Sequence, residues 1–467
     1  MDGAPFTGSH QEMNAFPPFT QPLQFLAIIS LLFDGLHAAS AAEKWPQYRG
    51  PQASGVDASA AAPTAWDVKA GENIRWETPI PGLAHSSPIV WDDRIYVATV
   101  TKAGESELKV GLYGDIAPVA EEEPHQWRLL ALDKATGKAV WDTVAHEGVP
   151  RVRRHPKSSH CNSTPATDGR RIVAIMGSEG LFCFEMDGRL AWKKDLGPMD
   201  SGYFMVPTAQ WGFASSPVIH DGKVVVLCDV QKDSFLAVYD LADGAEVWRT
   251  PRQEVPTWST PTIVTAEGRT QIVVNGWRHS GGYDFATGKE LWKLEGGGDI
   301  PVPTPITAHG FVYLTSAHGM YRPMRAIRLT ATGNITAAEP GKTTAHIAWE
   351  HVRKGNYMQT PIVVGGSVFA CNDNGVLTCF DAKSGEIHFS ERLTKGGEGF
   401  TASPVSDGKH VFFTSELGNV FAVPAAKTLS VAATSELGET CMATPALAGG
   451  TLYFRTRGKL MAIGTKD

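Results

Sequence analysis

The pattern of apolar and polar positions along this chain indicates many short strands rather than helices. Eight times, a Ser or Thr followed by Pro leads into a run of β-forming residues, as in Ser87-Pro88-Ile89-Val90. The prolines of the eight steps are Pro88, Pro165, Pro217, Pro261, Pro305, Pro361, Pro404 and Pro445. They lie 77, 52, 44, 44, 56, 43 and 41 residues apart. A four-stranded propeller blade takes about 40 to 45 residues, so the spacing predicts eight blades, with the longer gaps as loop insertions.

A second repeated feature, between consecutive prolines, is a turn that leads to tryptophan. The fullest copies are Leu132–Trp141, Tyr239–Trp248 and Tyr283–Trp292. Each contains an Asp that can bond turn amides and a Gly that can take the positive φ of a chain reversal, so each predicts a hairpin. Alternation along the next strand then places the Trp ring on one face, where it would pack between neighbouring sheets. We therefore interpret these tryptophans as structural.

The two ends of the repeat predict how the ring closes. Ile74–Thr78 resembles the outer strand of a blade, yet it precedes the first Ser-Pro step, and Thr451–Ile463 ends without a Trp strand of its own. Pairing the two would complete an eighth sheet and remove a free edge. The expected fold is therefore all-β: an eight-bladed β-propeller of four-stranded blades over residues 74–467, closed by an N-terminal strand, with residues 43–73 as an N-terminal extension.

Composition agrees with this fold and excludes one class of function. The 467 residues include 48 Gly, 30 Pro and 13 Trp, and 19% are charged, which suits short strands joined by tight turns. The net charge of −7 is small for this length, so no nucleic-acid surface is expected.

Residues 1–42 are expected to be an export signal. An apolar run over Gln21–Phe33 is followed by small residues at 38–42, as at a cleavage site, although no Lys or Arg precedes Lys44. The run is too short to span a bilayer and ends at Asp34, so no transmembrane span is expected in the mature chain. A periplasmic or extracellular protein is predicted.

The six cysteines are scattered and form no C-x-x-C pair, which argues against zinc ribbons, thioredoxin-like sites and c-type haem. Cys371 and Cys379 flank a turn at Asp373-Asn374-Gly375. They could form a disulfide across a hairpin or remain two small buried thiols, and the sequence leaves both alternatives standing.

The segments Ala131–Trp141 and Trp45–Pro51 (WPQYRGP) resemble the PQQ-like, quinoprotein-type, β-propeller repeat family. The resemblance covers residues 45–467. It implies the propeller fold but not one function, because the family includes pyrroloquinoline-quinone (PQQ) dehydrogenases as well as cofactor-free members similar to the outer-membrane assembly lipoprotein BamB.

Features of the family's enzymes are missing from this sequence. No two cysteines are adjacent, so the disulfide ring that covers the quinone has no counterpart, and the calcium ligands match no position. The first cysteine is Cys161, so the lipid anchor of the BamB-like lipoproteins is not expected either. The resemblance thus favours a non-catalytic scaffold or binding module without a cofactor. The alternative is a quinone- or metal-dependent oxidoreductase that uses PQQ with calcium in the central channel.

A ligand is expected at one axial mouth of the propeller, where loops converge. The loops that precede the innermost strands supply His85, His160, Asn162, Trp211, Trp258, Tyr357 and Gln359. The loops between second and third strands supply Arg278, His279, His318, Arg322 and Asp373. The same loops contain Cys161, Phe213, Phe400, Cys441, Glu416 and Arg455. No catalytic residue is predicted, and no metal ligand either, because the histidines lack metalloenzyme spacing.

Such a rim would suit a protein or envelope component, a small ligand or a carbohydrate, although polar loops at a propeller mouth are common without any ligand. Two insertions adjoin it. Thr101–Gln126 carries the acidic run Glu121-Glu122-Glu123, and Arg151–Lys157 is basic. These loops could pair with each other or serve a partner, and a charge run is most often just a solvated surface.

Overall fold

The computed structural model describes residues 44–111 and 117–465, a span that is all-β apart from the short 3-10 helix η1 (Pro51–Ala53). The expected export signal lies outside these residues. Within them, no helix has the length and apolar character needed to cross a membrane.

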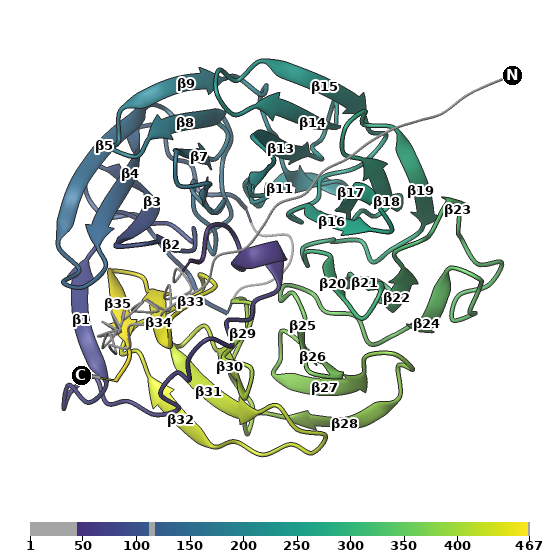
Figure 1. Cartoon of the computed structure of the whole chain (residues 1–467). Coiled ribbons are helices and arrows are strands. Elements are labelled where there is room, and N and C mark those ends of the chain that lie inside the picture. The colour runs from purple at the N-terminus through teal and green to yellow at the C-terminus, as the bar shows by residue number, and fades with distance from the viewer. Residues whose placement is uncertain (1–43, 112–116, 466–467) are drawn as a thin grey trace, which may run out of the picture. The chain divides into compact units, whose positions relative to one another are not determined.

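Eight antiparallel sheets form a ring around a central axis (Figure 1), which confirms the predicted eight-bladed β-propeller with four-stranded blades. The strands of blades 1 to 4 are β2 (Ile89–Trp91), β3 (Arg94–Lys102), β4 (His125–Asp133), β5 (Ala139–Gly148); β6 (Ala166–Thr167), β7 (Arg171–Ile175), β8 (Leu181–Glu185), β9 (Leu190–Lys194); β12 (Val218–His220), β13 (Lys223–Cys228), β14 (Phe235–Asp240), β15 (Glu246–Pro251); β16 (Thr262–Ala266), β17 (Arg269–Val274), β18 (His279–Asp284) and β19 (Glu290–Glu295).

The strands of blades 5 to 8 are β20 (Ile306–Ala308), β21 (Phe311–Thr315), β22 (Met324–Arg328), β24 (Ile347–His351); β25 (Ile362–Val364), β26 (Ser367–Cys371), β27 (Val376–Asp381), β28 (Ile387–Arg392); β29 (Val405–Ser406), β30 (His410–Thr414), β31 (Asn419–Pro424), β32 (Ala433–Glu436); β33 (Ala446–Ala448), β34 (Thr451–Arg455), β35 (Lys459–Ile463) and β1 (Ile74–Pro79). In addition, β23 (Gly333–Asn334) extends blade 4 in parallel with β19, and β10 (Gly202–Tyr203) pairs with β11 (Val206–Gln210) as a separate hairpin.

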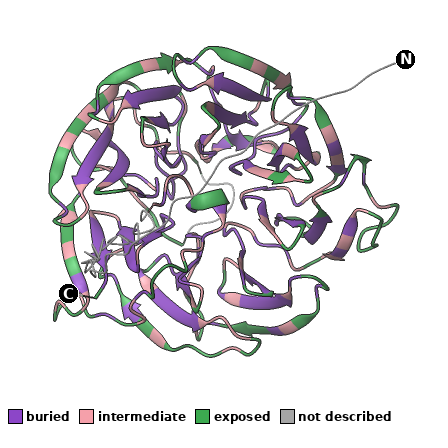
Figure 2. Cartoon of the chain, viewed as in Figure 1, coloured by how far each residue is buried: buried purple, intermediate pink, exposed green. Residues whose placement is uncertain are grey.

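The N-terminal strand closes the ring as predicted. β1 pairs antiparallel with β35, and Trp76 lies opposite Ala462. The first and last parts of the repeat therefore share one sheet, so blade 8 has its outer strand and the ring has no unpaired junction at this point. Figure 2 shows the resulting distribution of burial: inner strands are mostly buried, whereas outer strands such as β5 and β15 alternate between exposed and partly buried residues.

Five of the repeated turns lie against the tryptophan of the preceding blade. The indole nitrogen of Trp76 donates to the carbonyl of Lys134 at 3.0 Å. Gly137 has a φ of +70°, and a Cβ atom there would lie 2.5 Å from the Trp76 ring. Glycine is thus required both by the positive φ of the turn and by the indole ring of Trp76, which leaves no space for a Cβ atom. The same contact joins Trp141 to Gly188, Trp192 to Gly244, Trp248 to Gly288 and Trp349 to Gly385.

Near the axis, the Ser and Thr residues of the Ser/Thr-Pro steps form hydrogen bonds from blade to blade. The backbone amide of one step donates to the side-chain hydroxyl of the next, at 2.9–3.1 Å. The bonds run from Ser87 to Thr164, Thr164 to Ser216, Ser216 to Thr260, Thr304 to Thr360, Thr360 to Ser403 and Ser403 to Thr444. They form two arcs of four blades each, which we call the hydroxyl ring.

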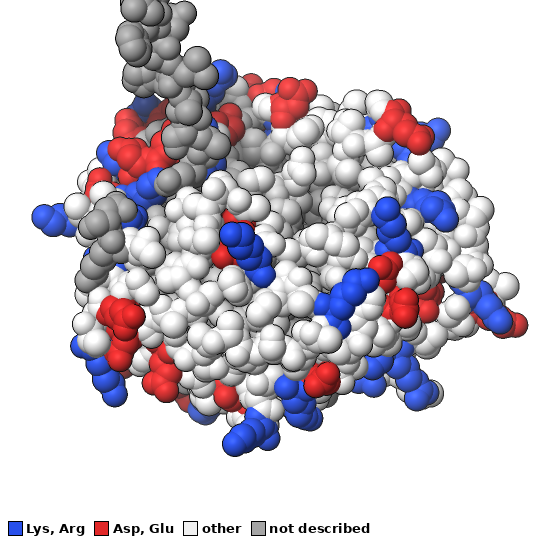
Figure 3. Space-filling model, turned by 60° about the horizontal axis from the view of Figure 1, so that its bottom comes forward, with Lys and Arg blue, Asp and Glu red and all other residues white. Residues whose placement is uncertain are grey.

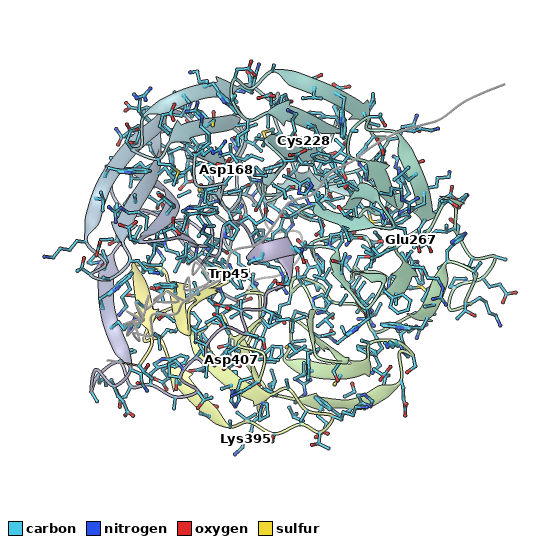
Figure 4. The ribbon with its side chains drawn as sticks, in the orientation of Figure 1. Trp45, Asp168, Cys228, Glu267, Lys395 and Asp407 are labelled. Carbon is cyan, nitrogen blue, oxygen red and sulfur yellow. The ribbon has the colours of Figure 1, made fainter. Side chains whose placement is uncertain are left out.

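The N-terminal extension plugs the channel beneath this ring. Trp45 exchanges backbone hydrogen bonds with Val90 and lies toward the centre of the ring in Figure 4. Arg49 is fully buried and donates to the carbonyls of Pro404 at 2.9 Å and Pro361 at 3.1 Å. Burial lowers the pKa of Arg49 to about 10, so it still carries its charge at neutral pH. The segment therefore binds to blades on different sides of the axis.

All six cysteines are free and buried. Cys371 lies opposite Leu377 and Cys379 lies opposite Phe369, so the two sulfur atoms are out of register across the hairpin. Burial is the main cause that raises the pKa of the Cys379 thiol to about 11, which keeps it protonated. Of the two alternatives, the structure has the buried thiols and not the disulfide.

The hydroxyl ring gives a direct stability prediction. Thr360→Val keeps the side-chain volume but leaves the buried amide of Thr304 without its acceptor, which should lower the free energy of unfolding by about 1–3 kcal/mol. Thr304→Val is the matched control, because the Thr304 hydroxyl has no hydrogen-bond partner among the described residues. The control should not lower the free energy of unfolding, because it removes a buried hydroxyl that has no partner among the described residues. Guanidinium unfolding measures both, and equal losses would contradict the assigned bond.

Candidate functional site

The loops that precede the innermost strands enclose a funnel on the propeller axis, with a volume of about 950 Å³ including space open to solvent. Its apolar wall consists of Trp211, Trp258, Ile300, Val302, Tyr357, Met358 and Met442. Its floor consists of Tyr48 from the plug and the hydroxyl-bearing Ser87, Ser216, Thr260, Thr304 and Thr444. His85, Lys157, Ser158, Asn162, Gly212, Ala214 and Thr401 complete the lining. The funnel is thus an aromatic and aliphatic mouth above a hydroxyl floor.

Two hydroxyl groups of the floor have no hydrogen-bond partner among the described residues. No bond of the hydroxyl ring joins Thr260 to Thr304, or Thr444 to Ser87, in the described structure. At these two junctions the hydroxyls of Ser87 and Thr304 have no partner among the described residues. The Tyr48 hydroxyl lies 3.2 Å from that of Ser403, which ties the plug to the ring. Because a buried hydroxyl without a partner is unfavourable, the floor favours a ligand or water that bonds to it.

The one lysine of the lining is neutralised. Lys157 donates from Nζ to Glu416 Oε1 at 2.5 Å, and the two side chains are only 3% and 2% exposed. Thr401 donates to the same oxygen at 2.6 Å. Burial lowers the pKa of Lys157 but the contact with Glu416 opposes this, and burial raises the pKa of the nearby Asp373. The funnel therefore presents little net charge to a ligand.

His85 lines the funnel as a neutral imidazole. Its Nε2 donates to the carbonyl of Lys157 at 3.0 Å. Burial, together with the positive charges of Arg154, Arg455 and Lys157, lowers the pKa of His85 to about 4 against the effect of that hydrogen bond. His85 is therefore an uncharged part of the wall at neutral pH.

Five of the twelve residues predicted to bind a ligand lie in the funnel lining. These residues are His85, Asn162, Trp211, Trp258 and Tyr357. The ring of Trp211 stacks on His155 at 4.0 Å, and Trp258 donates to the carbonyl of Gly212 at 3.0 Å. Asn162 accepts from Ser159 at 2.7 Å. These contacts hold the side chains in place before any ligand binds.

The other seven predicted residues do not line the funnel in the described structure. His160 bonds Glu121 at 3.0 Å, and Gln359 is buried. His279 bonds Glu290 at 3.0 Å on an outer strand. The backbone amide of Arg278 donates to Glu254, and the His318 ring lies 6.1 Å from the Tyr357 ring. The amide of Arg322 donates to the Val352 carbonyl, and the carbonyl of Asp373 accepts from the Phe400 amide.

The β10–β11 hairpin extends the wall of the funnel outward. Tyr203 and Ala209 on this hairpin pack in one cluster with Trp258 and Ile300. Met205 at the hairpin turn is 61% exposed. Apolar surface therefore continues from the funnel onto its rim, and the sequence patterns did not single out this hairpin.

The two charged insertions pair with each other, which was one of the two alternatives that the sequence left standing. Arg154 donates two hydrogen bonds to Glu121, at 2.9 and 2.8 Å. Val119 forms a backbone bridge with Arg154, and Lys102 bonds Glu123. The insertion of blade 1 and the loop that leads into blade 2 thus form one polar unit beside the funnel.

Sequence patterns missed several of the funnel residues. Tyr48 belongs to the WPQYRGP segment, which pointed to a family but not to a position in the channel. Met358 and Met442 stand one or two residues before the Ser/Thr-Pro steps, and that location was the available signal. Ile300 and Val302 look like strand residues and carry no chemical signature.

The funnel does not fit a calcium-bound quinone. Calcium takes six to eight oxygen ligands, including carboxylates, whereas no Asp or Glu lines this funnel among the described residues. The cation available for a quinone carboxylate is Lys157, which Glu416 already holds. The polar groups of this lining are hydroxyls, the Asn162 amide, the neutral His85 imidazole and the paired Lys157 ammonium.

Because His85 is buried as a neutral imidazole, we predict that the free energy of unfolding depends on pH. Its pKa is about 4 in the folded protein against 6.5 as the ordinary value, so the unfolded chain binds the proton more strongly in this window. The stability from neutral His85 is present above pH 6.5 and is lost as the pH falls toward 4. At about 1.4 kcal/mol per pKa unit, the loss should be about 2–3 kcal/mol.

His85→Gln should flatten this part of the profile, because it removes the proton-binding site but retains a side-chain donor. Urea unfolding at about pH 7 and about pH 4.5 measures the difference. His346→Gln, outside the funnel, should retain the slope of the unchanged protein. An equal slope in all three proteins would show that His85 is not the group responsible.

Comparison with known proteins agrees with this architecture. The family described as outer membrane protein assembly factor BamB matches residues 184–431, just over half of the chain. BamB from Moraxella catarrhalis is similar in structure, with 14% identity and a TM-score of 0.53 over 78% of this chain and 99% of that chain. No curated protein matches the sequence.

Two enzymes also have similar structures. A europium-containing methanol dehydrogenase has 12% identity and a TM-score of 0.59, over 89% of this chain and 90% of that chain. The quinohemoprotein alcohol dehydrogenase from Comamonas testosteroni has 12% identity and a TM-score of 0.57, over 91% and 81%. At such identities these likenesses show the fold alone. The sequence match over more than half of its length shows that this chain belongs to the PQQ-like repeat family of β-propellers described as outer membrane protein assembly factor BamB.

Proposed function

We propose that this protein is a non-catalytic binding module of the cell envelope or the extracellular space, and that its axial funnel holds an uncharged segment of a partner protein. The observation that carries the proposal is the funnel itself: an apolar and aromatic wall, a hydroxyl floor and a lysine neutralised by Glu416. A mouth of this kind binds by shape and apolar burial rather than by charge.

The wall chemistry favours a peptide over a sugar. Carbohydrates stack on aromatic faces and need many polar partners, whereas much of this wall is aliphatic or Met, such as Ile300 and Met442. Methionine adapts its shape to apolar partners. The free hydroxyls of Ser87 and Thr304 can bond peptide carbonyls at the floor. An extended segment with a large apolar side chain could place that side chain against the wall and bond its backbone carbonyls to the hydroxyls of the floor.

The rim supports a macromolecular partner. The hairpin continues the apolar surface outward, and its exposed Met205 lies beyond the funnel. On the face seen in Figure 3, basic and acidic side chains are interspersed and most of the surface carries neither. This face therefore presents a partner with no extended field of one sign.

The envelope location rests on the family and on the expected export signal. The family description names an outer membrane assembly factor, and an exported chain would meet its partner outside the cytoplasm. The rival function is an oxidoreductase, since two similar structures are alcohol or methanol dehydrogenases. The missing carboxylates in the funnel speak against a calcium–quinone site.

An array of short peptides with blocked ends tests the proposal, with uncharged aromatic or aliphatic sequences beside charged ones. We expect the uncharged peptides to bind and to change the tryptophan fluorescence. Trp211→Ala should weaken the best binder by at least about tenfold, or about 1.4 kcal/mol, since aromatic anchors dominate such contacts.

Trp91→Ala is the matched control, because Trp91 ends β2 and does not line the funnel. It should leave peptide affinity unchanged. The same protein is titrated with oligosaccharides and with PQQ plus calcium. Stoichiometric PQQ binding with dye-linked alcohol oxidation would refute the non-catalytic proposal, and selective oligosaccharide binding would refute the peptide ligand.

A further inference from the structure

One cluster outside the funnel has the donor set of a metal site. Glu121, His125 and His160 each offer one ligand atom, and these three atoms lie within 4.8 Å of one another. The side chains are 5%, 2% and 7% exposed. The cluster belongs to the paired insertions beside the funnel, and nothing in the proposed ligand binding uses it.

The tautomer of His125 leaves a ligand atom without a partner. Its Nδ1 lies 2.8 Å from the carbonyl of Glu123, and a carbonyl accepts, so Nδ1 carries the hydrogen. Nε2 of the neutral ring then presents a lone pair, and it has no hydrogen-bond partner among the described residues. This lone pair lies 3.9 Å from Glu121 Oε2. Glu121 Oε2 also accepts from Arg154 Nε at 2.9 Å and lies 3.0 Å from His160 Nε2, so the unpartnered ligand atom of the cluster is Nε2 of His125.

The other two ligands are already oriented. Arg154 holds both oxygens of Glu121, at 2.9 and 2.8 Å, as hydrogen-bond donors commonly hold metal-binding carboxylates. His160 Nε2 lies 3.0 Å from Glu121 Oε2. A zinc ion bound by these atoms would lie about 2.0–2.2 Å from each of them.

We propose that Glu121, His125 and His160 bind one zinc ion. Imidazole and carboxylate donors suit zinc, and a water molecule would complete a tetrahedral coordination. The hydrogen bond from His125 to the Glu123 carbonyl and the Arg154 bonds to Glu121 supply the outer contacts that such sites use.

The ion would act as a clamp between two blades. Glu121 and His125 come from the insertion of blade 1, and His160 comes from the loop that leads into blade 2. That loop continues to Asn162, which lines the funnel. Zinc would thus fix the loop that shapes one side of the funnel.

The test uses the full-length chain without a histidine tag, titrated with zinc chloride alone. We expect one zinc per chain to remain after desalting, as measured by elemental analysis. His125→Gln should weaken zinc binding by about a hundredfold or more, since the loss of even an outer contact costs about 10–100-fold. His346→Gln, a histidine outside the cluster, should bind zinc as the unchanged protein does.

X-ray absorption on the zinc-loaded, unchanged protein provides a measurement that does not depend on whether a variant folds. Two imidazole ligands and a carboxylate support the proposal. Substoichiometric zinc, a shell without two imidazoles, or equal zinc retention in His125→Gln and the unchanged protein would overturn it.

Discussion

The hydroxyl ring is the interaction on which the rest of this propeller depends. Proline has no amide hydrogen and keeps the preceding residue extended, so the amide of that Ser or Thr points to the next blade rather than into its own sheet. The hydroxyl of the next step accepts it, as Thr164 does for Ser87 at 3.1 Å. A repeat with apolar residues at this position would leave a buried amide unsatisfied at each of the six bonded junctions. The two open junctions lie half a turn apart, so the ring consists of two equal arcs.

This ring and the plug together decide where a site can form. The channel beneath the ring is filled by Trp45–Ala53, with Arg49 bound to carbonyls of two blades. The tryptophan and glycine pairs occupy the outer junctions between blades. Residues that could bind a ligand are therefore left in the loops at the mouth above the ring, because these loops are not part of the repeat. The funnel lining and the Glu121 cluster both include residues from such loops.

The repeat made the fold predictable in detail, down to the strand of Trp76 in blade 8, because each blade restates the same turn and the same axial step. Five of the eight junctions have the tryptophan–glycine contact, and the junction between blades 4 and 5 shows how another departs from it. Trp292 bonds Gln271 in its own blade, and Gly333 in the next turn touches no ring but adds β23 to the sheet. An insertion before Trp349 alters the turn that would otherwise lie against Trp292. The sequence pattern does not show which contacts replace the tryptophan–glycine contact at this junction.

The site was predictable only for residues that stand close to the axial step. Trp258 and Asn162 precede a Ser/Thr-Pro step by one or two residues, so the ring itself directs them to the axis. Arg278 and His279 follow a second strand, and their positions depend on loop paths that no repeat restrains. The Glu121 cluster was hidden for the same reason. Glu121 and His125 lie in the insertion of blade 1, whereas His160 lies 39 residues after Glu121, and only tertiary packing brings the three together.

The same reasoning explains why a fold shared with dehydrogenases at 12% identity carries no function with it. The ring hydroxyls, turn glycines and tryptophans stabilise the propeller itself, whatever the protein binds. The residues of the funnel wall, unlike the hydroxyls of its floor, are not part of the repeat, so the fold does not restrict them. In this chain its lysine is held by Glu416, its histidine is kept neutral by burial and its remaining wall is apolar. A mouth with this lining supports the proposed binding of an apolar side chain, while the hydroxyls of its floor can bond the backbone of the same segment.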